Sequence, residues 1–178
     1  MTASFRTVRL SPLLSLLLML VAAPVGNLAL VSQTAASGSE VHRTAPNFSR
    51  EDLSHKKINL ASYHGKVILL NFWATWCAPC LTEMPTFKEW QKQYGSDKFQ
   101  VIGVSMDDAA PEVIATVARL KLNYPVVMGD EHLGAAYGGV LGLPVTFLID
   151  RAGKISARFQ GAELPRIKGN IQSLLKSR

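Results

Sequence analysis

Residues 67–80 have the sequence VILLNFWATWCAPC. Its first half is an almost continuous apolar run of β-forming residues, which is typical of a central strand covered on both faces. Pro79 then stands where the first turn of a helix is expected, a position that tolerates proline. The stretch therefore predicts a buried strand followed at once by a helix, with Cys77 and Cys80 at the junction between them.

The rest of the chain alternates strand and helix patterns. The helix after the cysteines is expected to end at Tyr94, before Gly95, and to kink at Pro85. Further elements are expected as a hairpin over 47–60, strands over 100–106, 125–128, 145–149 and 155–159, and helices over 111–122, over 133–137 and from Leu164 onward. This order predicts an α/β fold with a mixed central sheet and helices on both faces.

The two cysteines are the candidate reactive groups, because they are the only cysteines of the chain. A zinc site would need two more ligands, and no two of the four histidines stand at ligand spacing. A structural disulfide across so short a loop would constrain the unfolded chain very little. The pair is therefore interpreted as a redox-active dithiol, with metal binding and an inert turn as alternatives.

The expected helix gives the two cysteines different surroundings. The N–H groups at a helix N-terminus stabilise a thiolate over a thiol, which makes Cys77 the better nucleophile. Cys80, one turn further in, is expected to be more buried and to attack a mixed disulfide formed by Cys77.

Three polar or aromatic residues surround the pair in the sequence. Trp76 is predicted to border a substrate groove. Asn71, inside the apolar strand, is expected to be a hydrogen-bonded buried amide. Glu83 is expected to be a solvated helix carboxylate, with a tuning role as the alternative.

The N-terminus carries an export signature. Arg6 and Arg9 precede an apolar run over residues 10–31, the pattern of a signal peptide, and the run is also long enough to span a bilayer if it is not cleaved. In both cases the arginines stay inside and the following domain faces outward. The expected organisation is a signal peptide or membrane anchor (1–31), a linker (32–44) and one folded domain (45–178).

Composition fits this organisation. Hydrophobic residues make up 48% of the chain and charged residues 18%, as in a folded globular protein. The net charge is +6, but the basic residues form no continuous run with interleaved aromatics. Nucleic acid is therefore not an expected partner.

Several segments together resemble the TlpA/ResA-like branch of the thioredoxin superfamily, which is related to the AhpC/TSA and Redoxin families. These are APNF (45–48), YHGKV (63–67), LNFWATWCAPC (70–80), EMP (83–85), GLPVTFLID (142–150) and GKI (153–155). The resemblance covers about residues 45–178. It implies a thioredoxin fold with an added N-terminal hairpin and a helix–strand insertion near residues 109–128.

The resemblance also implies roles for residues. Cys77 would be the attacking thiol and Cys80 the resolving one, and no cofactor would be needed. Pro144 would be a cis-proline facing the disulfide, which leaves the Leu143 backbone to pair with an extended segment of an unfolded or flexible substrate. Some relatives place an acidic residue near the end of the second strand. Asp107 and Asp108 lie near that place, and Asp108 is taken as the candidate tuning residue, with a plain loop role as the alternative.

Members of this branch are exported or membrane-tethered reductants, often in cytochrome c maturation. The resemblance therefore implies a site of action in the bacterial periplasm or on the outer face of the cytoplasmic membrane, with a membrane protein as electron donor. Three alternatives stay open: a thiol oxidant that donates disulfides, a Cu(I)-handling thioredoxin-like protein, and a peroxidase, whose usual cysteine pattern is absent here.

Overall fold

The computed structural model describes residues 42–177. The expected signal peptide or membrane anchor lies outside these residues, as does most of the expected linker. Within the described part of the chain, no helix is both long enough and apolar enough to cross a membrane.

A five-stranded sheet forms the centre of the domain, with the strand order β5-β4-β3-β6-β7. Its strands are β3 (Val67–Trp73), β4 (Phe99–Ser105), β5 (Val126–Met128), β6 (Val145–Ile149) and β7 (Ile155–Gln160). The first three are parallel to one another, whereas β6 runs antiparallel to both β3 and β7. The predicted mixed sheet is confirmed, with strand ends that differ from the expected ones by a residue or so.

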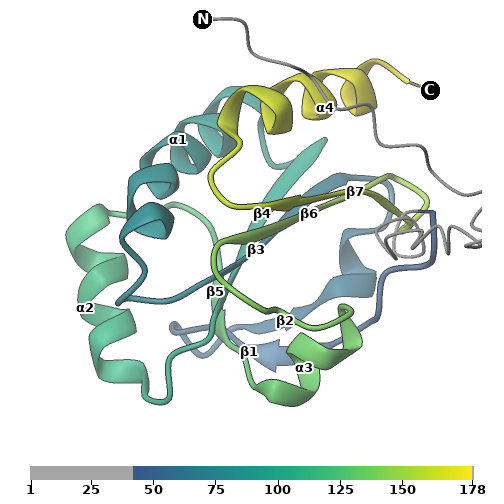
Figure 1. Ribbon diagram of the computed structural model, residues 1–178. Helices are drawn as coiled ribbons and strands as arrows, with labels where there is room; N and C mark the ends of the chain where they lie inside the picture. The colour runs from purple at the N-terminus through teal and green to yellow at the C-terminus, as the bar shows by residue number, and fades with distance from the viewer. Residues whose placement is uncertain (1–41, 178) are drawn as a thin grey trace, which may run out of the picture. The chain divides into compact units, whose positions relative to one another are not determined.

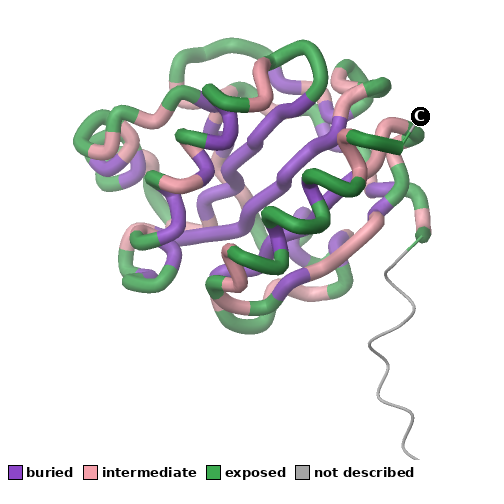
Figure 2. Tube along the Cα trace, turned by 90° about the horizontal axis from the view of Figure 1, so that it is seen from above, coloured by how far each residue is buried: buried purple, intermediate pink, exposed green. Residues whose placement is uncertain are grey.

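The central strand β3 is buried along its whole length. Its side chains alternate between the two faces of the sheet, so that Leu69 and Trp73 join one apolar cluster while Leu70 and Phe72 join the other. Asn71 therefore lies on the same face as Trp73. Figure 2, which looks down on that face, shows the buried strands as a layer beneath outer elements that are exposed on one side.

Helices and the N-terminal hairpin cover both faces of the sheet, as predicted (Figure 1). The face that carries Trp73 packs against α1 (Ala78–Tyr94), α2 (Ala110–Leu120) and α4 (Leu164–Lys176). The other face packs against β1 (Ser49–Glu51), β2 (Lys57–Asn59), the 3-10 helix η2 (Leu60–Tyr63) and α3 (Glu131–Ala136). As expected, α1 contains Pro85 and ends at Gly95, whose positive φ of 74° suits glycine.

Residues 42–44, which the sequence assigned to the linker, pack on the domain. The His42 N–H donates to the Ile155 carbonyl at 2.6 Å, and the Ile155 N–H donates to the Arg43 carbonyl at 2.9 Å. The last residues of the expected linker thus lie beside the start of β7.

Candidate active site

Cys77 and Cys80 form a disulfide at the N-terminus of α1. Cys77 is the N-cap residue of this helix, and its Sγ accepts a hydrogen bond from the Cys80 N–H at 3.3 Å. Cys77 keeps 5% of its surface exposed, whereas Cys80 is completely buried. The expected difference in burial is confirmed, and only Cys77 can be reached from outside without a rearrangement.

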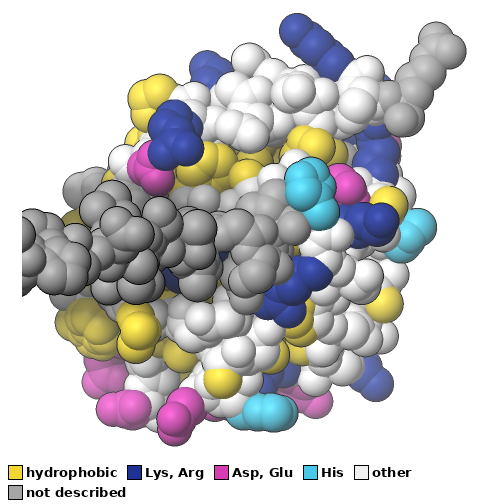
Figure 3. Space-filling model, turned by 45° about the vertical axis from the view of Figure 1, so that its right-hand side comes forward, with side chains coloured by type: hydrophobic (Ala, Val, Ile, Leu, Met, Phe, Trp, Pro, Cys, Tyr) yellow, Lys and Arg dark blue, Asp and Glu magenta, His cyan; other side chains and the backbone are white. Residues whose placement is uncertain are grey.

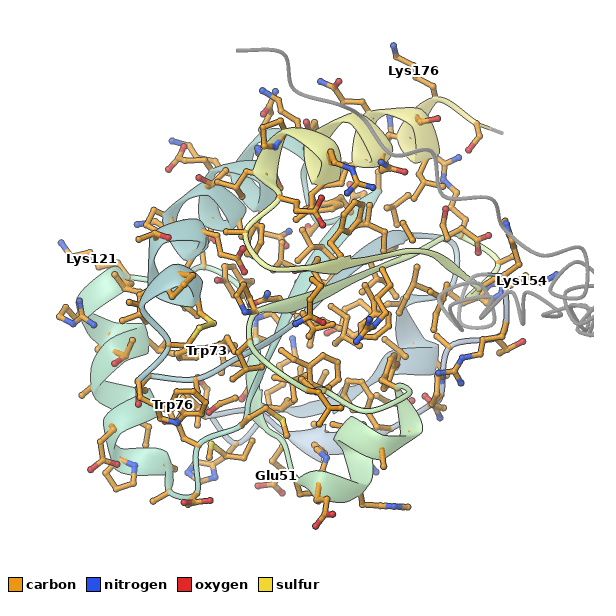
Figure 4. The ribbon with its side chains drawn as sticks, in the orientation of Figure 1. Glu51, Trp73, Trp76, Lys121, Lys154 and Lys176 are labelled. Carbon is orange, nitrogen blue, oxygen red and sulfur yellow. A yellow bond between two sulfur atoms is a disulfide. The ribbon has the colours of Figure 1, made fainter. Side chains whose placement is uncertain are left out.

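Segments distant in the sequence meet beside this disulfide. Val145 pairs with Phe72, so the preceding residue, Pro144, lies level with Trp73 at the end of β3. The Leu143–Pro144 peptide bond is cis, and the Leu143 side chain packs against both apolar clusters. Trp76 is 71% exposed, an unusual state for a tryptophan, and projects beside the disulfide end of α1 (Figure 4).

Glu83 is completely buried, so the expectation of a solvated helix carboxylate is wrong. Glu83 lies on the side of α1 that packs on the sheet, where Asn71 of β3 meets it. The Asn71 Nδ2 donates to Glu83 Oε1 at 2.8 Å and to Thr146 Oγ1 at 3.0 Å. The prediction that Asn71 is a hydrogen-bonded buried amide is confirmed, and the three side chains join α1 to β3 and β6.

Burial raises the pKa of Glu83 to about 8, although the hydrogen bond from Asn71 acts in the opposite direction. The second carboxyl oxygen, Oε2, is buried without a hydrogen-bond partner, as are Trp73 Nε1 and Tyr124 OH. Burial, and then the charge of Glu83, raise the pKa of Tyr124. A buried carboxyl group with such a pKa can take up or release a proton near neutral pH, one turn of helix from Cys80.

Asp107 braces the loop that leads into the disulfide. Its carboxylate accepts hydrogen bonds from the Thr75 N–H at 3.0 Å, from Thr75 Oγ1 at 2.5 Å and from Ser105 Oγ at 2.8 Å. Asp108, the candidate tuning residue from the sequence, is exposed and makes none of these contacts. A tuning role for Asp108 stays a prediction, whereas Asp107 acts on the position of the loop.

Sequence reasoning did not single out Thr146 or Tyr124, and it chose the less connected of two neighbouring aspartates. The spacing Ser105-x-Asp107 after a strand end was the available signal, because such pairs form local hydrogen-bonded turns. For metals, residues 42–177 contain no group of three or more His, Cys, Asp or Glu side chains placed to hold an ion.

Comparisons with known proteins agree with this geometry. The family model described as the AhpC/TSA family matches residues 41–158. The chain is 35% identical over 137 residues to the thiol-disulfide oxidoreductase ResA of Bacillus thuringiensis subsp. konkukian, covering 77% of this chain and 78% of the relative. It is 36% identical over 143 residues to the thioredoxin-like protein YneN of Bacillus subtilis, covering 79% and 83%.

A solved structure shares the fold. The putative thiol:disulfide interchange protein DsbE from Chlorobium tepidum superposes with a TM-score of 0.71 at 29% identity, covering 76% of this chain and 97% of that one. The substrates of such thiol–disulfide exchange are proteins that contain disulfides. By family model, by sequence and by fold, the chain belongs to the AhpC/TSA family and is a TlpA/ResA-like thiol–disulfide oxidoreductase of the thioredoxin superfamily.

Proposed function

We propose that this protein reduces disulfides of exported proteins outside the cytoplasm, in cytochrome c maturation or a related assembly process, and receives its electrons from a membrane protein. The observation that carries this proposal is the disulfide at the N-terminus of α1, in which Cys77 alone keeps surface exposure beside the exposed Trp76. A surface dithiol of this kind exchanges with partner proteins and needs no cofactor.

The proposed exchange proceeds in two steps. The Cys77 thiolate attacks one sulfur of a substrate disulfide, which forms a mixed disulfide and releases the other substrate sulfur as a thiolate that takes a proton. The Cys80 thiolate then attacks Cys77 Sγ, so that the Cys77–Cys80 disulfide forms and the second substrate thiol leaves. Two electrons pass to the substrate, and a donor dithiol later restores the reduced pair.

The proposed substrate contacts involve Trp76, Leu143 and Pro144. A proline has no N–H, and the Leu143 backbone precedes β6 at the disulfide end of the sheet. An extended substrate segment can add to this backbone as a short strand while its apolar side chains contact Trp76. Both contacts suit unfolded or flexible segments rather than folded surfaces.

Glu83 and Asn71 are proposed to tune the buried cysteine. A Cys80 thiol must lose its proton before it can attack, and no solvent reaches it. Glu83, three positions further along α1, lies on the same face and is the nearest buried carboxyl group in sequence. In its ionised form Glu83 can accept that proton, and the raised pKa makes this carboxylate a stronger base than an ordinary glutamate, while Asn71 fixes one of its oxygens.

The proposed location rests on the N-terminal sequence. Residues 10–31 form an apolar run behind Arg6 and Arg9, so the chain is exported or anchored through this run. The domain then faces the bacterial periplasm, or the outer face of the cytoplasmic membrane.

The roles of the cysteines are tested by insulin reduction and by trapping. Cys77→Ala should abolish turnover, because no surface thiol remains to begin the exchange. Cys80→Ala should keep the first step and accumulate mixed disulfides with substrate proteins in cells, where mass spectrometry identifies the captured partners. Turnover in Cys77→Ala, or trapping by Cys77→Ala rather than by Cys80→Ala, would contradict the assignment.

The direction of exchange is tested by equilibrium with glutathione. A reductase should have a potential nearer the value of about −270 mV of thioredoxin than the value of about −120 mV of a strong oxidant. A potential above about −180 mV would favour the thiol oxidant instead.

A further inference from the structure

Three loops and the last turn of α4 meet at the end of the sheet opposite the disulfide. We name this end the basic pole and define it by residues 63–66, 95–98, 150–154 and 174–177. These segments contain five basic side chains, Lys66, Lys98, Arg151, Lys154 and Lys176, against two acidic ones, Asp97 and Asp150. The excess of positive charge arises from segments that are distant in the sequence, which is why no basic run appears in the chain.

Hydrogen bonds hold the basic pole together. Lys66 Nζ donates to the Ser96 carbonyl at 2.7 Å, and the Gly65 N–H donates to the Arg151 carbonyl at 2.9 Å. The Arg151 guanidinium donates to the carbonyls of Leu175, at 3.0 Å, and of Ser177. The backbones of all four segments are therefore fixed to one another, so their charged side chains extend from one surface.

The disulfide pole has the opposite charge. It consists of the loops at residues 74–79, 106–109, 129–131, 138–144 and 161–163, which contain Asp107, Asp108, Asp130, Glu131 and Glu163 but no lysine or arginine. Of these, Asp130 pairs with Arg50 and Glu163 with Arg166 on neighbouring elements, and Arg158 of β7 donates to the Gly139 carbonyl. Among the described residues, the acids of this pole that lie outside these two ion pairs are therefore Asp107, Asp108 and Glu131. Figure 4 shows the separation, with Lys154 and Lys176 far from Trp76.

We propose that the basic pole is a docking surface for a bilayer of anionic phospholipids. An anionic surface attracts the pole that carries excess lysine and arginine and repels the acidic disulfide pole, so both poles favour the same orientation. Figure 3, which turns the side of Lys154 toward the viewer, shows separate lysine and arginine side chains among polar, histidine and acidic ones on the visible part of this face.

The chain itself brings this pole near a bilayer. This docking proposal depends on one part of the proposed function, the membrane anchor at residues 10–31, which ends shortly before the domain. His42, the first described residue, pairs with Ile155 at the edge of the basic pole. The intervening residues 32–41 span at most about 35 Å when fully extended. Such a tether limits distance but does not fix orientation, which leaves the orientation to the charges of the domain.

An apolar recess opens beside these charges. Its volume is about 160 Å³, and its lining includes Tyr63, Ile149 and Ala152. The carboxylate in this lining, Asp150, accepts hydrogen bonds from the Ala152 and Lys154 N–H groups. Lys66 Nζ stands 5.7 Å from the centroid of the Tyr63 ring at its rim. Positive charge next to an apolar recess suits an amphiphile with an anionic headgroup better than a free anion, because a free anion has no apolar part to bury.

Docking at this pole would turn Trp76 and the disulfide away from the membrane. The active site would then face the solution in which flexible protein segments are found. The same orientation would keep the acidic disulfide pole clear of the headgroups.

The test uses the full-length chain reconstituted into two kinds of vesicle, one of phosphatidylcholine alone and one with phosphatidylglycerol at half the lipid. An amine-reactive reagent then labels lysines, and mass spectrometry measures each site. We expect labelling of Lys98, Lys154 and Lys176 to fall about tenfold in the anionic vesicles and to recover in 1 M salt, where the screening length is about 3 Å. Lys121 and Lys168, which are exposed and lie outside the basic pole, should change less than about twofold.

A charge-reversal pair supplies the matched control. Lys154→Glu/Lys176→Glu should remove the protection of Lys98, whereas Lys121→Glu/Lys168→Glu changes the net charge equally and should keep it. Both variants should reduce insulin like the wild-type chain in detergent, because none of these residues lies at the disulfide pole.

The outcomes separate docking from anchoring. A chain that floats with both vesicles but shows equal labelling in each overturns docking and leaves the anchor standing. Flotation with anionic vesicles alone, with Lys98 protected, supports docking without the anchor, and flotation with neither overturns both. Equal protection by soluble glycerol phosphate without vesicles would also overturn the proposal, because it would show a site for a free anion.

Discussion

The two ends of α1 bury polar side chains in different ways. At its C-terminal end, Gln91 donates to the Phe99 carbonyl and accepts from the Val101 N–H at 2.7 Å, and Gln100 donates to Gln91 and to the Val101 carbonyl. At its N-terminal end, Glu83 Oε1 accepts a hydrogen bond from Asn71, whereas Glu83 Oε2 has no hydrogen-bond partner.

The difference separates structure from chemistry. The Gln91 cluster satisfies the groups that it buries and carries no charge, so it serves as a polar join between α1 and β4. The Glu83 cluster buries an ionisable group with incomplete hydrogen bonding, which costs stability that a purely structural site would avoid. This loss of stability therefore falls at the end of α1 where the disulfide lies.

The largest expected effect is on the pH dependence of stability, through Glu83→Gln. The pKa of Glu83 is about 8 in the folded state and about 4.5 in the unfolded one, so the folded state binds more protons between these values. Stability of the oxidised wild-type protein should therefore fall as pH rises from about 4.5 to 8, by on the order of 4 kcal/mol, and level off above.

In Glu83→Gln this part of the pH dependence should disappear, because glutamine does not ionise. Urea unfolding at several pH values measures it, with Glu89→Gln, an exposed carboxylate on the same helix, as control. If the free energy of unfolding varied with pH in the same way for wild type and Glu83→Gln, Glu83 would not be an ionisable group of unusual pKa, and the two ends of α1 would not differ in this respect.

Gln91→Leu should sharpen the comparison from the other end. It removes partners from the buried Val101 N–H and Phe99 carbonyl, which should destabilise the protein by about 1 to 3 kcal/mol. Insulin reduction by the folded variant should be unchanged, since the Gln91 cluster lies far from the disulfide along α1. Gln93→Leu, at an exposed position, controls for added apolar surface, and a loss of turnover in Gln91→Leu alone would argue against a purely structural role.

The smallest expected effect concerns the loop before Cys77. Asp107→Ala removes the acceptor for both Thr75 donors and should cost about 1 kcal/mol of stability. A less ordered Cys77 should lower kcat/KM for insulin reduction by about three- to tenfold. Asp108→Ala is the matched control, and an equal effect of both variants would show that charge, rather than the brace on Thr75, is responsible.

Much of the fold could be predicted because hydrophobic spacing is unambiguous in the central elements. The almost continuous apolar run of β3 indicated a strand buried on both faces, and the turn over residues 150–153 indicated the β6–β7 hairpin. The ends of α2 and α3 were less certain, because capping there depends on backbone geometry and on Asp130, whose side chain caps α3.

The site was predicted in part. Two cysteines in a distinctive spacing identified the reactive pair, but the burial of Glu83 depends on which face of α1 meets the sheet. That face could have been found, because Cys80, Glu83, Met84 and Phe87 recur at helical spacing. Tyr124 and Thr146 reach the cluster from other elements, so no local pattern identifies them.

The pairing of His42 and Arg43 with β7 has a consequence for how the chain is made. Arg43 donates to the Ala136 carbonyl across 93 positions, and Tyr137 donates to the Pro46 carbonyl across 91. A ribosome releases the early residues of the domain well before their partners. The Arg43 side chain and the Pro46 carbonyl therefore stay exposed to water while most of the chain is still being synthesised. Folding of this domain can therefore finish only after β7 has emerged, which makes the start of the domain one of the last parts to become protected from proteases.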